Sequence, residues 1–250
     1  MSLIALAFGL LGAVSGSFIG VVAERVHTGQ SFLRGRSRCN SCARTLGPAD
    51  LVPIFSWTFS AGRCRTCGAK VPGLYALLEL SLALVFALGY LRLGLTLSLL
   101  AFVAATAVLA FIVVYDIRHT IVPPYASGLL AIFALAYALL GASSLHVLGG
   151  ALFAAGATGA LFLALHVFSG GRAMGLGDAP VAFALALIAG PYALAGLFFS
   201  FWIGALCGIV ILLARQGGPR MGIEVPFVPF LALGYLLALF VEWNPLAYVL

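Results

Sequence analysis

The feature that most constrains this chain is a succession of long apolar runs separated by short polar segments. Most of these runs approach the length of about 20 residues that an α-helix needs to cross a bilayer. The longest run contains Gly190-Pro191, and we expect it to form two passes around that break, with a re-entrant or tilted first half as the alternative. The sequence therefore predicts an all-α polytopic membrane protein with about eight transmembrane helices. The predicted spans are Leu3–Val22, Leu74–Leu91, Leu95–Tyr115, Pro124–Gly141, Leu145–Phe168, the double run Ala179–Ala214, and Phe227–Val241.

The composition excludes a soluble globular domain. The chain is 63% hydrophobic and only 8% charged, whereas soluble domains are about half apolar and about a quarter charged. Its net charge of +6 requires no nucleic-acid partner, because membrane topology and anionic lipid headgroups account for an excess of basic residues.

The basic residues predict the orientation in the membrane. Positive charge is retained on the cytoplasmic side during insertion. Arg118, Arg172, Arg215 and Arg220 fall in alternate loops on the same side as the first long polar segment, and Arg92 falls on the other side. We therefore expect this segment to be cytoplasmic. Eight of the thirteen Lys and Arg residues lie in that segment: Arg25, Arg34, Arg36, Arg38, Arg44, Arg63, Arg65 and Lys70.

The polar segment, residues 24–72, carries the pattern of a metal site. Cys39-x-x-Cys42 is followed after 21 residues by Cys64-x-x-Cys67, a spacing typical of two knuckles that place four thiolates around zinc. A disulfide framework fits poorly with a reducing compartment. About fifty residues cannot build a sizeable core, so a structural zinc would supply much of the fold. We expect a zinc-ribbon-like insert with short strands and assign Cys207, within a span, to apolar packing.

Two aspartates stand where apolar runs meet polar loops: Asp116 after Val114-Tyr115, and Asp178 after Gly175-Leu176-Gly177. A carboxylate at such a place is costly unless it has a partner or a task. Both fall on the predicted cytoplasmic face, so we interpret them as a catalytic aspartyl dyad. Simpler interpretations stay open at this point: Asp178 as a helix N-cap, and Asp116 as the ion-pair partner of Arg118 or of the insert.

Together these motifs resemble the bacterial type IV prepilin peptidase family, a GxGD-type membrane aspartyl protease family that combines leader peptidase and N-methyltransferase activities. The likeness covers nearly the whole chain. It includes the two cysteine pairs, Asp116-x-x-His119-x-x-x-Pro123, Gly175-x-Gly177-Asp178 and Pro226-Phe227-x-Pro229-Phe230-Leu231-Ala232. The chain departs from the family pattern at Pro180, where a Lys is usual, and at Gly20, where an Asn is usual.

The resemblance implies a multi-pass protein of the bacterial inner membrane that cleaves a short basic leader from prepilins or pseudopilins on the cytoplasmic side. It also implies methylation of the new N-terminus with S-adenosylmethionine. It assigns Asp116 and Asp178 as catalytic residues and the four cysteines as the metal site. The corresponding division of the chain is residues 1–23 as the first transmembrane helix, 24–72 as the zinc insert and 73–250 as the protease core.

Other functions compete with this interpretation. A signal-peptide-peptidase-like intramembrane protease also uses paired aspartates, but the cysteine pairs and the early position of Asp116 disfavour it. A proton-coupled transporter with the aspartates as relays usually shows internal repeats and acids in mid-membrane. A non-catalytic membrane anchor that carries a zinc-bound docking module is the last alternative.

Overall fold

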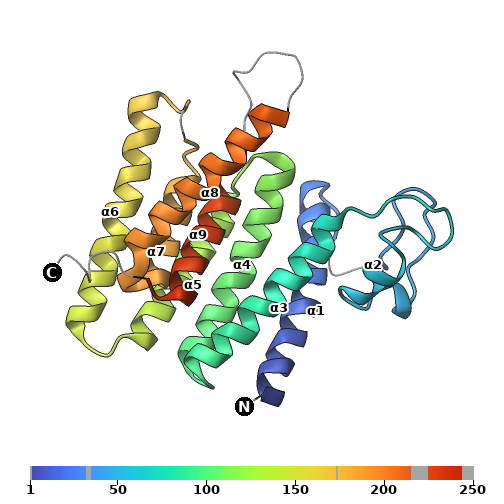
Figure 1. The fold of residues 1–250 in the computed structure, drawn as a ribbon, viewed down its shortest axis with the longest axis horizontal. Helices are drawn as coiled ribbons and strands as arrows, with labels where there is room; N and C mark the ends of the chain where they lie inside the picture. The colour runs from blue at the N-terminus through green and yellow to red at the C-terminus, as the bar shows by residue number, and fades with distance from the viewer. Residues whose placement is uncertain (1, 32–34, 173, 215–224, 244–250) are drawn as a thin grey trace. The chain divides into compact units, whose positions relative to one another are not determined.

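The computed structural model describes residues 2–31, 35–172, 174–214 and 225–243 (Figure 1). These residues form helices and loops without a strand, and six apolar helical stretches are long enough to cross a membrane. The predicted all-α polytopic fold is therefore confirmed. Arg34, Arg215 and Arg220, which entered the charge argument, lie outside the described residues. The helices are α1 (Ser2–His27), η1 (Pro48–Asp50), α2 (Phe55–Phe59), α3 (Gly73–Leu93), α4 (Leu97–His119), α5 (Pro124–Gly141), α6 (Leu145–Ser169), α7 (Asp178–Ala189), η2 (Gly190–Tyr192), α8 (Ala193–Ala214) and α9 (Val228–Val241).

The chain divides into two compact units, Met1–Thr96 and Leu97–Leu250. In the first unit, α1 packs along α3. Glycines on α1 allow this close approach: a Cβ on Gly12 would overlap the backbone carbonyl of Leu82, and one on Gly16 would lie 2.8 Å from the Cα of Glu79. Small residues at such positions let helix backbones come together where lipid offers no hydrophobic driving force.

The packing of α1 against α3 can be tested with a matched pair of substitutions. Gly12→Ala should destabilise the first unit by about 1–3 kcal/mol, because α1 and α3 must separate to admit the methyl group. Gly9→Ala is the control, because its Cβ would lie 3.5 Å from the Ala83 carbonyl oxygen, an ordinary contact. Thermal unfolding of the purified protein in detergent measures the difference. Equal midpoints of thermal unfolding for the two variants would contradict the close packing of α1 against α3.

The insert between α1 and α3 contains η1, α2 and two knuckles. Instead of the short strands that we expected, its described residues form one isolated antiparallel bridge at each knuckle, Arg38 with Thr45 and Arg63 with Lys70. The two knuckles are thus local turns of the same construction. With so little regular structure, the insert depends on contacts other than backbone ladders to hold its shape.

A strained turn in the middle of the insert, just before α2, is hydrogen-bonded to α3. The Phe55 N–H donates to the Pro53 carbonyl at 2.6 Å, and the intervening Ile54 has φ 65° and ψ −54°, a conformation that is rare for a β-branched residue. The Ile54 N–H donates in turn to the carboxylate of the buried Glu79 at 2.6 Å. Glu79 therefore holds the turn from within the membrane helix pair.

In the second unit, α7 is the central helix. It packs against α5, α6, α8 and α9, and its side chains are buried almost throughout. With 12 residues it is about 18 Å long, shorter than the hydrocarbon core of about 30 Å. The predicted break at Gly190-Pro191 is confirmed, because α7 ends at Ala189 and η2 separates it from α8. The short α7 places its first residue, Asp178, inside the helix bundle.

Candidate functional site

The four cysteines of the insert converge. Their sulfur atoms all lie within 4.8 Å of one another, and the Sγ atoms of Cys39 and Cys67 are 3.8 Å apart. Zinc–sulfur bonds of about 2.3 Å in a regular tetrahedron place the sulfurs about 3.8 Å apart. The cluster therefore has the donor set and the size that a zinc ion requires, as the cysteine spacing predicted.

Each knuckle is a tight turn that directs backbone amides at a sulfur. The Cys39 N–H donates to Arg44 O and the Cys64 N–H to Ala69 O, which closes the two loops. Hydrogen bonds from the Cys67 and Thr66 amides lower the pKa of the Cys64 thiol to about 6. The turn itself thus favours the thiolate form that binds metal.

Asp50 joins the two knuckles, a role that the sequence analysis missed. Its carboxylate pairs with Arg44 Nη2 at 2.7 Å and with Arg65 Nε at 3.5 Å, and it accepts the Gly47 N–H at 3.0 Å. Asp50 is the one carboxylate among residues 28–72, amid seven Lys and Arg. The sequence contained a signal for these ion pairs, because a single acid among seven basic residues has several possible partners nearby. These two arginines are therefore engaged by Asp50.

Asp116 lies in the last turn of α4 and is 5% exposed. Its Oδ2 accepts a hydrogen bond from the Val228 N–H at 3.2 Å. Val228 is the first residue of α9, so a free amide at a helix N-terminus points at the carboxylate. The Pro226-Phe227 segment therefore delivers a backbone donor to Asp116, which the sequence pattern did not reveal.

Asp178 is the first residue of α7 and is 7% exposed. Its Oδ2 accepts the Gly175 N–H at 3.0 Å, and its own N–H donates to the Gly175 carbonyl at 3.2 Å. The helix N-cap is Gly177, so Asp178 is not the capping residue that the simpler interpretation required. The reciprocal bonds hold the carboxylate in the Gly175–Asp178 loop.

The two aspartate segments meet within the second unit. Asp178 lies near enough to Asp116 for their charges to repel each other. Their loops also touch, because a Cβ on Gly177 would lie 2.6 Å from the Cβ of Val122. The absent side chain at Gly177 is thus what admits the segment after Asp116. Helices α4, α7 and α9 together bring two buried carboxylates and two backbone donors to one place.

Two histidines near these segments have structural contacts. The His119 ring packs on Tyr115 with 4.7 Å between ring centroids. His166 Nδ1 lies 2.9 Å from the Met174 carbonyl oxygen, which fastens the loop before Gly175 to α6. His166 therefore supports the Asp178 loop from outside it.

Comparison with known proteins identifies the family. A family model described as the Bacterial Peptidase A24 N-terminal domain matches residues 10–93. A prepilin leader peptidase/N-methyltransferase of Bacillus subtilis (strain 168) is 33% identical over 230 residues, which are 92% of this chain and 91% of that protein. The chain belongs to the prepilin leader peptidase/N-methyltransferase family. The resemblance noted in its motifs is therefore confirmed, as is the prediction of a prepilin peptidase at the level of the family.

Other relatives of this family agree. A prepilin leader peptidase/N-methyltransferase of Myxococcus xanthus (strain DK1622) is 34% identical over 220 residues, 84% of this chain and 64% of that protein. A type 4 prepilin-like proteins leader peptide-processing enzyme of Escherichia coli O78:H11 (strain H10407 / ETEC) is 30% identical over 263 residues, 92% of this chain and 93% of that protein. No solved structure matches the chain significantly.

The contact between the Gly177 and Val122 loops can be tested at one position. Gly177→Ala should lower leader removal by about tenfold or more, because the new Cβ displaces Val122 and misplaces Asp178 by a fraction of an ångström or more. The backbone of Gly177, with φ −67° and ψ −20°, accepts alanine without strain, so the effect is steric. Gly128→Ala on α5 is the control, because nothing lies within 4 Å of its Cβ. The rate of leader loss from a co-expressed prepilin measures both, and equal rates would show that the contact is dispensable.

Proposed function

We propose that this protein is a membrane-embedded aspartyl endopeptidase that removes the short basic leader from type IV prepilins or pseudopilins. Asp116 and Asp178 are its catalytic residues. The observation that carries the proposal is the convergence of these two buried carboxylates, each with one oxygen bound by a backbone N–H, in a chain of this family. Buried carboxylates in a membrane protein mark functional sites by default.

The proposed chemistry is general acid–base hydrolysis. Two carboxylates held close in a poorly hydrated site are not both ionised, so the pair retains one proton and binds one water molecule between them. The ionised aspartate removes a proton from this water while the protonated partner donates a hydrogen bond to the scissile carbonyl. The proton belongs to the pair rather than to either residue.

The backbone donors have a defined part in this scheme. The Val228 and Gly175 amides each occupy the Oδ2 atom of one aspartate and leave both Oδ1 atoms for the water and the substrate. Fixed amides of this kind hold the carboxylates in place without a charged side chain that would compete for them.

We further propose that the site and the insert face the cytoplasm and that substrates reach them from the inner leaflet of the inner membrane. The concentration of Lys and Arg between the first two spans supports this orientation. The cysteine cluster binds structural zinc, since four thiolates leave no open position for a substrate. Prepilins or pseudopilins and membrane lipid are then the partners, and no nucleic acid is required.

The second proposed activity is methylation of the new N-terminus, which the names of the relatives support. S-adenosylmethionine supplies an activated methyl group for this step. The described insert is too small for a doubly wound nucleotide-binding domain, so its binding residues must come from another kind of pocket.

Co-expression with a prepilin tests the peptidase activity. The chain is produced with a type IV prepilin in a bacterium that lacks its own prepilin peptidase, and the pilin is analysed by mass spectrometry. We expect a mass loss equal to the leader, with cleavage on the carboxyl side of a glycine. A pilin that keeps its leader, in cells where the chain is present in the membrane, would refute the proposal.

A further inference from the structure

One stretch of the insert differs in chemistry from the rest. Residues 51–62 contain no Asp, Glu, Lys, Arg or His, whereas residues 24–72 as a whole contain eight Lys and Arg. The stretch comprises the strained turn at Ile54, helix α2 and the residues that lead into the second knuckle. The absence of charge makes this the part of the insert that an apolar surrounding would accept.

Large apolar side chains of this stretch are exposed. Phe59 is 80% exposed and Phe55 57%, and their rings stack with 6.2 Å between the centroids. Leu51 and Val52, in the turn before α2, are each 45% exposed. Large apolar side chains that gather outside the transmembrane spans indicate an interaction surface. We call Leu51, Val52, Phe55 and Phe59 the apolar patch of the insert.

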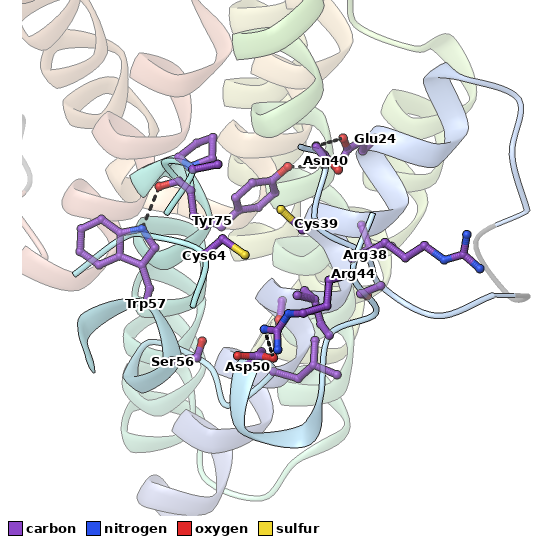
Figure 2. A pocket seen from close by; sticks show the side chains of 18 of the residues that line it. Glu24, Arg38, Cys39, Asn40, Arg44, Asp50, Ser56, Trp57, Cys64 and Tyr75 are labelled. Atoms are coloured by element: carbon purple, nitrogen blue, oxygen red, sulfur yellow. Dashed lines mark hydrogen bonds and ion pairs between the residues drawn. The ribbon is translucent and has the colours of Figure 1, made fainter. Parts of the chain in front are cut away.

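The other face of α2 is fixed to the insert. The Trp57 ring packs on Gly62, where a Cβ would lie 2.9 Å from the Cζ2 atom of the indole. Its Nε1 donates a hydrogen bond to the Val71 carbonyl at 3.1 Å (Figure 2). Trp57 thus holds α2 on the side that faces the knuckle, and the two phenylalanines project from a helix whose position is set.

Hydrogen bonds to α3 fix the level of this stretch along the membrane helices. The Tyr75 hydroxyl donates at 3.1 Å to Glu24, which is the first charged residue of α1 and marks the end of its apolar part (Figure 2). Glu79, which accepts the Ile54 N–H, lies four residues further along α3, or about 6 Å deeper at 1.5 Å per residue. Figure 1 accordingly shows α2 beside the α1–α3 pair rather than beyond its end. The turn before α2 therefore reaches below the level at which the membrane helices become polar.

The patch lies at the same level as the lipid-facing surface of α3. With 21 residues, α3 is about 31 Å long, close to the hydrocarbon thickness of about 30 Å. Leu77 and Leu80, on either side of Glu79 in the sequence, are 60% and 45% exposed. Exposed apolar side chains of a membrane-spanning helix contact lipid. Because Glu79 binds the turn at this level, the apolar patch continues a surface that lipid already covers.

We propose that the apolar patch is an interfacial membrane anchor, which inserts into the boundary between headgroups and acyl chains on the side of the insert. Interfacial helices bury their apolar face by about 5–10 Å at this boundary, which agrees with the level that Glu79 sets. The insert is then attached to the bilayer at α1, at α3 and at α2. The occupant is lipid rather than a protein partner, because the patch lies at membrane depth and has no charge with which to select a partner.

Photocrosslinking of the full-length protein tests the proposal. The photoreactive analogue p-benzoylphenylalanine is introduced at Phe55 or Phe59, where it keeps an aromatic side chain, and the protein is reconstituted in nanodiscs of phosphatidylcholine. This lipid has no net charge, so lipid adducts report apolar insertion rather than attraction to the basic residues. Mass spectrometry of the intact chain measures the fraction that carries a lipid adduct.

Two control positions set the scale of the adduct yield. Leu77, on the lipid-facing side of α3, gives the yield for full lipid contact, and the exposed Gln30, three residues beyond the end of α1, gives the yield for a hydrophobic label outside the bilayer. We expect Phe55 and Phe59 to be within about twofold of Leu77 and about tenfold or more above Gln30. Yields at both positions as low as that of Gln30 would overturn the proposal. Crosslinks to another protein in place of lipid, in intact cells, would overturn it as well.

A charge in the patch gives an independent test. With the label at Phe55, Phe59→Asp should lower the lipid adduct by about fivefold or more, because a carboxylate resists transfer into the acyl region. Thr66→Asp, an exposed position in the second knuckle, is the matched control and should leave the yield unchanged. Resistance of the insert to protease confirms that both variants fold. A yield that is the same in Phe59→Asp as in Thr66→Asp would refute the anchor.

Discussion

Asp116→Asn and Asp178→Asn should each reduce leader removal by about 1,000-fold or more, the loss expected when an acid–base pair can no longer share a proton. An asparagine retains the volume of the side chain and can still accept the hydrogen bond from Val228 or Gly175. The helices around the site should therefore assemble as before. Leader removal from a co-expressed prepilin, measured as the ratio of processed to unprocessed pilin over time, reports the loss.

The double variant sharpens this test. Because the two carboxylates act as one unit, Asp116→Asn combined with Asp178→Asn should be no slower than either single variant. Glu242→Gln makes the same carboxylate-to-amide change outside the site and should cleave at the wild-type rate. The amount of each variant in the membrane fraction controls for insertion. Persistent cleavage in either single variant would reject the dyad.

The membrane fold was predictable because its determinants are local. Apolar runs of a given length predict helices wherever they occur, and α5 begins at Pro124 and ends at Gly141, as expected from the sequence. The ends of other helices were less predictable. Helix α4 extends four residues beyond Tyr115, so that Asp116 is a helical residue rather than the start of a loop. Polar residues at a helix end can continue the hydrogen-bonded ladder, which a hydropathy pattern does not detect.

The sequence pointed to the two aspartates of the candidate site but not to the backbone amide that binds Asp116. Carboxylates are rare in this chain, so Asp116 and Asp178 were conspicuous, and their glycine-rich or proline-rich surroundings supported a loop function. The Val228 amide was not visible, because every residue except proline has one and only the tertiary fold aims it at a side chain 112 positions away. The ion pairs of Asp50 escaped notice for a related reason, since seven basic residues in the insert were all possible partners.

In the insert, the sequence pattern predicted the clustering of the cysteines but not the secondary structure around them. The spacing of the cysteines correctly indicated that the four thiols cluster, since their sulfurs converge in a group that could hold a metal ion. The expected strands are reduced to two single bridges because each knuckle closes within a few residues and the chain then leaves in another direction. Positive φ at Ala43, the residue after the first knuckle, and at Gly68, the residue after the second, produces that change of direction. The metal rather than a sheet is therefore expected to hold the insert together.

Zinc should accordingly decide whether the insert folds. We expect about one zinc per purified chain, and replacement of Cys39 and Cys42 by Ser should remove it. Structural zinc contributes about 10–16 kcal/mol in small zinc-binding peptides, more than a segment of this size gains from its own core. Metal content by mass spectrometry and protease cleavage within residues 35–72 measure the two consequences. Cys207→Ser is the matched control, because this fifth cysteine lies in α8, outside the cluster.

The same experiment tests whether the membrane helices that carry the aspartates fold independently of the insert. The membrane helices of the Cys39/Cys42 double variant should remain folded, because their contacts are made by apolar side chains and glycines rather than by the metal. Circular dichroism should therefore retain most of the helical signal while the insert becomes sensitive to protease. An insert that stays protected without its metal would mean that the ion pairs of Asp50 and the Glu79–Ile54 hydrogen bond suffice to hold it.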